Sequence, residues 1–167
     1  MAFPGGFFPE HADLDPGVRL RPLALEEAGA AAAALSGMDP WLTLEYRAES
    51  LEAHLRRPDP SFYKYALEKG GELAGVVCLR HPWLLGPYLE TLGLWPGFQG
   101  QGLGETVINW LIESCRERAR NLWTAVSAFN HRARRFYARH GFVEVGVLTD
   151  LVKPGFNEIL LRRILVS

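Results

Sequence analysis

The residues best suited to chemistry form a glycine-rich turn, Gln99 to Gly104, with the sequence Gln-Gly-Gln-Gly-Leu-Gly. Glycine adopts backbone angles that are closed to other residues, and it presents no Cβ to a ligand. The turn runs into a helical pattern, and the first N–H groups of a helix have no partner within that helix. Each such N–H binds a charged phosphate oxygen with about 1.5–3 kcal/mol. The candidate pyrophosphate-binding residues are therefore Gln99, Gly100, Gln101, Gly102, Leu103, Gly104 and Glu105.

Two other phosphate-binding loops do not fit this turn. A dinucleotide fingerprint that began at Gly100 would need a third glycine where the chain has Glu105. A P-loop over residues 97–104 would need lysine at Leu103 and a hydroxyl residue at Gly104. The turn thus predicts a phosphate ligand bound by main-chain donors; the alternative is a purely structural glycine-rich connection.

A second segment, Asn130 to Phe142, also combines a helix start with candidate reactive groups. Asn130 is a good N-cap for a short helix that ends at Gly141. Four side chains then follow at helical spacing on one face, namely Ala133, Phe136, Tyr137 and His140.

Together these segments resemble the two signature motifs of the GCN5-related N-acetyltransferases (GNAT). The turn is similar to that family's Gln/Arg-x-x-Gly-x-Gly/Ala motif, preceded as usual by a strand and a proline. The second segment is similar to Asn-x-x-Ala-x-x-Phe/Leu-Tyr-x-x-x-Gly-Phe, at the expected distance downstream. The resemblance covers about residues 88–142. It implies the GNAT acyl-CoA N-acyltransferase fold, an α+β fold in which helices flank a central mixed, mostly antiparallel sheet.

The resemblance also implies acetyl-CoA as co-substrate, with its pyrophosphate on the main-chain amides of the turn. It places Asn130 beside the pantetheine arm, counts Arg135 among the cofactor-binding residues, and points the Tyr137 hydroxyl at the CoA sulfur. The thiolate that departs has a conjugate acid of pKa near 8.5 for a simple thiol, so a phenol in a dry pocket can donate a proton to it. The alternative is that Tyr137 is an ordinary core aromatic.

The thioester oxygen needs a hydrogen-bond donor where negative charge develops. The family uses a main-chain N–H at the splayed end of its fourth strand, which implies a donor near Leu92, Gly93 or Leu94 here. Leu92 and Leu94 are accordingly counted among the cofactor-binding residues. Gly93 fits either a bulge beside a ligand or simple close packing.

A base must remove a proton from the acceptor ammonium. Glu90 is the carboxylate on the predicted fourth strand, and a period of two places it on one face with Leu92 and Leu94. We therefore name Glu90 as the catalytic base, with a solvated or salt-bridged carboxylate as the alternative. His81 and His131 are weaker candidates.

The acceptor is predicted to be a small-molecule or protein amine. In the family the acceptor site is framed by the first two helices and the loop between the last two strands. Those regions hold aromatic and carboxylate side chains that suit a cation, although surface charge explains the same residues: Trp41, Glu45, Tyr46, Glu49, Asp150 and Lys153. The competing function is a binding module that senses acyl-CoA without turnover.

The elements that must position these residues follow from apolar periodicity, turns and breakers. They alternate in the order β-α-α-β-β-β-α-β-α-β-β, which favours one mixed sheet flanked by helices. Strands are predicted over 18–23, 62–68, 72–80, 88–95, 122–128, 142–148 and 157–165, and helices over 25–35, 48–57, 104–118 and 132–140. We expect residues 1–17 to form an irregular arm and residues 18–167 a single domain.

Composition excludes several classes of protein. With 48% hydrophobic and 22% charged residues, the chain resembles a soluble globular domain, and no run of roughly 18 apolar residues predicts a membrane span. The start lacks secretory-signal features, which favours a cytoplasmic protein. The slightly acidic chain argues against nucleic acid as a partner. Cys78 and Cys115 are predicted to be reduced thiols, no metal site is expected, and the resemblance leaves room for a homodimer.

Overall fold

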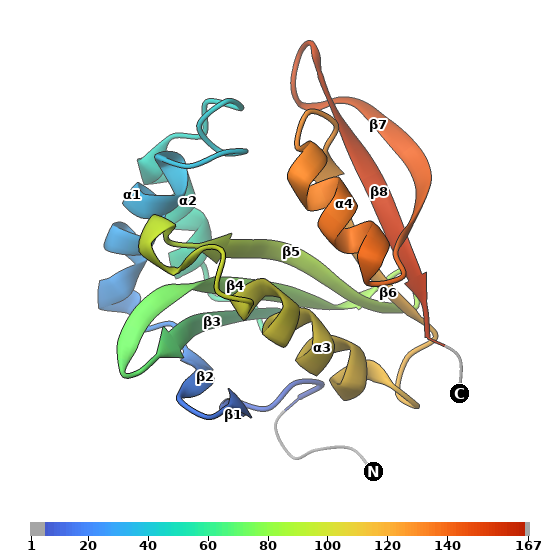
Figure 1. The fold of residues 1–167 in the computed structure, drawn as a ribbon. Coiled ribbons are helices and arrows are strands. Elements are labelled where there is room, and N and C mark those ends of the chain that lie inside the picture. The colour runs from blue at the N-terminus through green and yellow to red at the C-terminus, as the bar shows by residue number, and fades with distance from the viewer. Residues whose placement is uncertain (1–5, 166–167) are drawn as a thin grey trace.

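The computed structural model describes residues 6–165, and its centre is one eight-stranded sheet with helices on both faces (Figure 1). The strands lie in the order β1-β2-β3-β4-β5-β6-β8-β7, and every neighbouring pair is antiparallel except β5 and β6. This confirms the predicted α+β, mostly antiparallel mixed sheet. The strands are β1 (Ala12–Asp15), β2 (Val18–Pro22), β3 (Phe62–Lys69), β4 (Glu72–Trp83), β5 (Gly86–Leu94), β6 (Asn121–Ser127), β7 (Val143–Lys153) and β8 (Phe156–Ile164).

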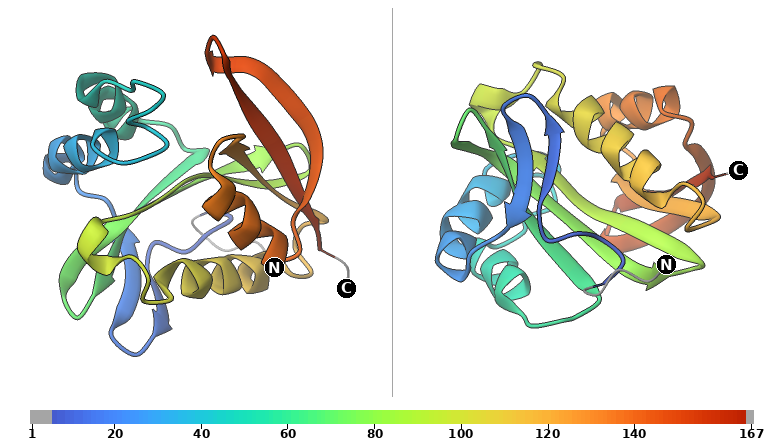
Figure 2. Two further views of the ribbon diagram at one scale, coloured as in Figure 1. Left: turned by 45° about the horizontal axis from the view of Figure 1, so that its top comes forward. Right: turned by 90° about the horizontal axis from the view of Figure 1, so that it is seen from below.

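The four predicted helices are present, with α1 and α2 on one face of the sheet and α3 and α4 on the other (Figure 2). The predicted helix over 25–35 begins as a separate 3-10 turn, because its first three residues make the tighter type of hydrogen bond. The helical elements are η1 (Leu25–Glu27), α1 (Ala28–Ser36), α2 (Ala48–Arg56), η2 (Pro96–Phe98), α3 (Leu103–Cys115) and α4 (His131–Arg139).

Each face of the sheet has its own hydrophobic core. Under α3, buried Val107, Ile108 and Leu111 pack on the strands. Under α1 and α2, Leu35 and Leu55 join a separate cluster that includes residues of β4. A fully buried aliphatic side chain contributes about 1.5–3 kcal/mol, so the two clusters fix α2 and α3 on opposite sides of β5.

The predicted irregular arm over residues 1–17 is partly wrong. Residues 1–5 lie outside the described residues, but Ala12–Asp15 forms β1, antiparallel to β2. Ala12 and Leu14 both pack against the α3-side core, as the period of two in a strand requires, and Phe8 is only 3% exposed there. Apolar contacts therefore hold this segment on the sheet.

β5 and β6 part soon after they meet. They pair in parallel at Tyr88 with Trp123 and at Leu89 with Thr124. Beyond these residues β5 continues against β4 as far as Leu94, whereas β6 follows β8 (Figure 1). The main-chain edges of two strands are therefore turned toward the space between them.

Both cysteines are buried free thiols, as predicted. Burial raises the pKa of Cys115 to about 12 and also raises that of Cys78. Within residues 6–165, no helix is long and apolar enough to cross a membrane.

Candidate active site

A cavity of about 570 Å³ opens where β5 and β6 part. Its walls come from α2 and the loop before it, from β5, β6, α4 and β8, and from the end of β7. It brings together four of the predicted catalytic and cofactor-binding residues, along with a histidine and a carboxylate that the sequence did not single out. These are Glu90, Leu92, Asn130 and Tyr137, with His54 and Glu158.

The glycine-rich turn has the backbone that a phosphate cradle needs. Gly100 and Gly102 have φ angles of 73° and 80°, in the left-handed region that favours glycine. Apart from the adjacent backbone, no atom lies within 4 Å of the position that a Cβ would take at either residue. Gly102 is the N-cap of α3, and no side chain caps the helix. The start of α3 thus offers main-chain donors and space in front of them, which fits the pyrophosphate of CoA.

The side chains of the turn brace its backbone. Gln99 donates from Nε2 to the Leu94 carbonyl at 2.9 Å, and Gln101 donates to the Gly97 carbonyl at 3.1 Å. Lys69 in turn donates to Gln101 Oε1 at 2.6 Å. The main-chain N–H of Gln99 also donates to the Pro96 carbonyl, at 3.4 Å, so of the two glutamines it is Gln101 that would reach a phosphate, through its main-chain N–H. The same holds for Leu103, which is buried in the core, and for Glu105, whose side chain is exposed.

Helix α4 lies beside the turn and carries the second motif. A Cβ at Gly104 would lie 3.4 Å from Phe136, which shows how closely the two segments approach. Asn130 is the N-cap, because its Oδ1 accepts a hydrogen bond from the Ala133 N–H at 3.1 Å. It also lines the cavity, whereas Arg135 is exposed on the outside of the helix.

Tyr137 is 7% exposed and lines the cavity from α4. Burial raises the pKa of its phenol to about 12, against the opposing effect of a side-chain hydrogen bond with Thr124. The phenol is therefore neutral over the physiological range, and a neutral phenol at a cavity wall can donate a proton or a hydrogen bond.

The three residues predicted to lie near the thioester oxygen are found in three different environments. Leu92 lines the cavity, whereas the Leu94 carbonyl is occupied by Gln99. A Cβ at Gly93 would lie 2.5 Å from Leu35, so close packing against α1 is the reason for this glycine. Gly93 pairs in register with Val76, so the bulge considered at this position is not found there.

The bulge in β5 lies at Glu90 instead. Leu89 and Thr91 pair with consecutive residues of β4, which leaves Glu90 as the extra residue between them. As a result Glu90 reaches α2, while Leu92 and Leu94 pack against the core under α3. The expectation that Glu90 shares a face with these leucines is wrong, because the inserted residue shifts the period of two.

Glu90 is engaged by two basic side chains. Arg80 donates from Nε to one carboxylate oxygen, and His54 Nε2 contacts the other, each at 2.8 Å. Burial raises the pKa of the Glu90 carboxyl, but the hydrogen bonds from His54 and Arg80 outweigh it and the net pKa is lowered. The salt-bridged alternative for Glu90 is thus the arrangement observed, and its role as base stays a prediction.

The other predicted bases lie away from the cavity wall. His81 stacks on Phe7 with ring centroids 3.8 Å apart, and burial lowers its pKa. His131 is exposed in the first turn of α4. Neither histidine is among the residues that line the cavity.

Only some of the residues predicted to bind the acceptor lie at the cavity. Trp41 and Tyr46 line it. Glu45 forms an ion pair with Lys153 at 2.9 Å, which joins the loop before α2 to the end of β7. The Glu49 side chain is 79% exposed, and Asp150 accepts a hydrogen bond within the β7–β8 turn, from the Gly155 N–H at 2.8 Å.

Sequence reasoning missed His54 and Glu158. Glu158 is 8% exposed on β8, and Ser127 donates to its Oε1 at 2.7 Å. Burial raises the pKa of Glu158, and the bond from Ser127 only partly offsets it. A carboxylate in the apolar strand pattern of residues 156–164 was a signal for Glu158, whereas His54 offered none, since it follows Leu51 in an ordinary amphipathic helix.

Among residues 6–165, no group of three or more histidine, cysteine, aspartate or glutamate side chains could hold a metal ion. The site therefore consists of a main-chain cradle at α3, a buried phenol on α4, and carboxylates with a histidine on the opposite wall.

Comparison with known proteins identifies relatives of this arrangement. A family model described as the Acetyltransferase (GNAT) family matches residues 25–142. A protein of Bacillus subtilis (strain 168), provisionally named a ribosomal protein bS18 alanine N-acetyltransferase, is 30% identical over 137 residues. The match covers 80% of this chain and 85% of the relative.

Solved structures show the same fold. A protein of Thermus thermophilus, provisionally described as an acetyltransferase, is 24% identical with a TM-score of 0.70, over 94% of this chain and 90% of that one. A mutant form of spermidine N-acetyltransferase SpeG from Vibrio cholerae is 20% identical with a TM-score of 0.68, over 90% and 95% of the two chains.

Proposed function

The chain belongs to the GNAT family of acetyltransferases, and on that premise we propose that it transfers acetyl from acetyl-CoA directly to a primary amine, with Tyr137 as general acid. The observation that carries this proposal is the position of Tyr137, buried at the wall of the cavity between the parted strands β5 and β6. A core aromatic without a role in catalysis would not need to face that space.

The donor is held from the α3 side in this proposal. Gly100 and Gly102 leave open space in front of the helix start, so the main-chain N–H groups of residues 100–105 can bind the pyrophosphate. Asn130 lies where the cavity meets α4 and is the candidate contact for the pantetheine arm. The candidate donor to the thioester oxygen is a main-chain N–H on the free edge of β5, near Leu92.

Chemistry then requires one bond to form and one to break. The amine nitrogen attacks the thioester carbonyl carbon, the C–N bond forms, and the C–S bond breaks. Tyr137 gives its phenolic proton to the departing sulfur, and the proton lost from the new amide nitrogen restores the phenol. The products are the acetylated amine and the free thiol of CoA.

The acceptor side favours a cation. Burial raises the pKa of Tyr46, and Coulomb repulsion from Glu158 and Glu90 adds to this, so both carboxylates lie within electrostatic reach of its hydroxyl. Trp41 adds an aromatic face to the same wall. We propose that Glu158, which has Ser127 as its partner in the wall, contacts the ammonium group of the acceptor. The relatives' names suggest two amines to test first, a peptide with N-terminal alanine and spermidine.

The proposal is tested with Tyr137→Phe, which keeps the aromatic ring and removes the phenolic hydroxyl with its proton. Release of free CoA thiol should fall by about 100-fold or more at saturating acetyl-CoA, the range expected for loss of a general acid. The affinity for CoA, measured by isothermal titration calorimetry, should stay within about 2-fold because the turn is untouched.

Turnover by Tyr137→Phe at the wild-type rate would remove Tyr137 from the mechanism. If the wild-type protein bound CoA but released no thiol with any amine of a broad panel, the chain would be an acyl-CoA-binding module instead.

A further inference from the structure

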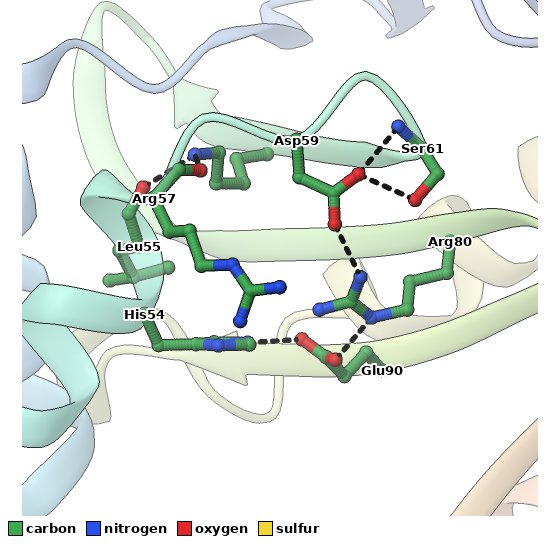
Figure 3. A network of polar contacts seen from close by, with 8 residues as sticks. His54, Leu55, Arg57, Asp59, Ser61, Arg80 and Glu90 are labelled. Atoms are coloured by element: carbon green, nitrogen blue, oxygen red, sulfur yellow. Dashed lines mark hydrogen bonds and ion pairs between the residues drawn. The ribbon is translucent and has the colours of Figure 1, made fainter.

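A chain of polar contacts runs from the start of β3 to the cavity (Figure 3). Ser61 donates from its main-chain N–H and its hydroxyl to Asp59 Oδ1, at 2.9 and 2.6 Å. Asp59 Oδ2 accepts from Arg80 at 3.1 Å, Arg80 donates to Glu90 at 2.8 Å, and Glu90 meets His54 at 2.8 Å. Of the four ionisable side chains in this network, His54 is the most exposed, at 38%.

Glu90 is better placed to orient a base than to act as one. Its two oxygens are taken by two different partners, and the net pKa of its carboxyl lies below the ordinary value. A carboxylate in that state binds a proton weakly. Arg80 is itself held by Asp59, and this pair fixes the orientation of the Glu90 carboxylate.

His54 has the complementary properties. A neutral imidazole has one nitrogen that donates and one that accepts, and the partner of the first decides the tautomer. Because the carboxylate of Glu90 accepts, Nε2 of His54 carries the hydrogen and Nδ1 carries the lone pair. None of the hydrogen bonds among residues 6–165 uses Nδ1. A lone pair held in this way is available for a proton.

Several charged and titratable groups surround this part of the cavity. The carboxylate of Glu90 contacts His54 directly, and Arg80 contacts the other oxygen of the same carboxylate. The remaining groups share the cavity wall with His54 and come from β5, β8 and the loop before α2: Tyr88, Glu158 and Tyr46. Away from the cavity, Lys64 lies over the Phe62 ring that His54 packs against. The groups on the cavity wall itself are anionic or neutral, which suits an imidazolium formed during the reaction.

We propose that His54 is the base that deprotonates the acceptor ammonium, and that Glu90 is its positioning residue. This inference rests on the proposed N-acetyltransferase function. The ammonium N–H bond breaks, its proton goes to Nδ1 of His54, and the nitrogen lone pair becomes free to attack the thioester. The imidazolium is stabilised by Glu90 and then releases its proton to solvent. The sum is one ammonium and one thioester converted to one amide, one thiol and one proton.

Two substitutions separate a base from a purely structural histidine. His54→Gln keeps a side-chain N–H for Glu90 but has no basic lone pair, and His54→Ala leaves space for an added imidazole. We expect each to lower kcat/KM for the amine by about 100-fold, and free imidazole to restore His54→Ala at least 10-fold. In both variants kcat/KM should fall from a higher pH than in the wild type, because the amine must then lose its proton before it binds. His11→Ala is the matched control, because His11 is exposed outside the cavity.

A near wild-type rate for His54→Gln would overturn the proposal, as would a His54→Ala variant that imidazole does not rescue. Thermal melts and CoA titration check that each variant is folded and binds the donor. These measurements compare variants with an active wild type. If the proposed function is wrong, the wild type itself releases no thiol, so the two kinds of failure can be told apart.

Discussion

The site has two walls, the helix start at α3, which lies outside the lining of the cavity, and the α2 side of the cavity, and they hold their chemical groups by different means. On the α3 side, the candidate donors are main-chain N–H groups at Gly100 to Glu105, set by the φ angles of a contiguous turn. On the α2 side, they are side chains, and the pair formed by His54 and Glu90 joins residues 36 apart in the chain. The first wall presents main-chain groups, held in place by the side chains of Gln99 and Gln101, whereas the second depends on how β4, β5 and α2 are packed together.

This difference assigns the two walls to different tasks. Main-chain donors at a helix start suit a phosphate whatever the neighbouring side chains are, so the α3 wall can serve a donor common to many enzymes. A wall of side chains changes with every substitution, so in the proposed function the α2 wall would set which amine is bound and deprotonated. Perturbing each wall should therefore affect donor and acceptor separately.

Gly102→Val is expected to give the largest difference between the effect on acetyl-CoA and the effect on the amine. A branched side chain at φ 80° is strained by about 1–2 kcal/mol, and it occupies the space where the pyrophosphate would lie. Together with the loss of an N–H to phosphate bond, this should raise KM for acetyl-CoA by roughly 100-fold. KM for the amine should change by less than about 3-fold, as measured by thiol release.

Gly71→Val is the matched control. Gly71 also has a φ of 80° and no neighbour within 4 Å of its Cβ position, but it lies in the β3–β4 turn. It should lose similar stability and keep its affinity for CoA. Equal CoA affinities in the two variants would show that the glycine turn does not hold the phosphates.

Acid should weaken the α2 wall through Asp59. Hydrogen bonds from the side chain and main chain of Ser61, and then from Arg80, lower the pKa of Asp59 from 3.8 to about 2. Since the folded pKa lies below the unfolded one, this stabilisation is present above about pH 4 and is lost as the pH falls toward 2. Urea unfolding midpoints should fall over that window, and less steeply in Asp59→Asn. Parallel slopes for the two proteins would contradict this.

The smallest effect is expected from Lys153→Ala. The Lys153–Glu45 pair is 2.9 Å long, but 74% of the Glu45 side chain is exposed, so it contributes at most about 1 kcal/mol and is screened by salt. KM for the amine should rise about 2- to 3-fold at low salt, with no change for acetyl-CoA. Glu45→Gln should give the same result, and the double variant should add nothing. An additive double variant would mean that the pair does not act together.

Much of the fold could be predicted from local patterns. The stripe that includes Val107, Ile108 and Leu111 repeats at helical spacing, and each of the four predicted helices was found. Strand β1 could not be predicted, because Ala12 and Leu14 have no strong strand preference and are held by long-range packing. The same limit applied to Gly93, whose packing against Leu35 depends on the docking of α1.

The sequence by itself identified the candidate donor side of this protein. The turn from Gln99 to Gly104 and the segment from Asn130 to Tyr137 are contiguous, so helix geometry and glycine backbone angles relate their groups without a tertiary structure. Only the tertiary structure brought together the residues of the candidate acceptor side. A bulge in β5 turned Glu90 toward α2, and the packing of α2 on β4 brought His54 to meet it. Strand register and helix docking are set by the sum of many distant contacts, and no short sequence pattern encodes that sum.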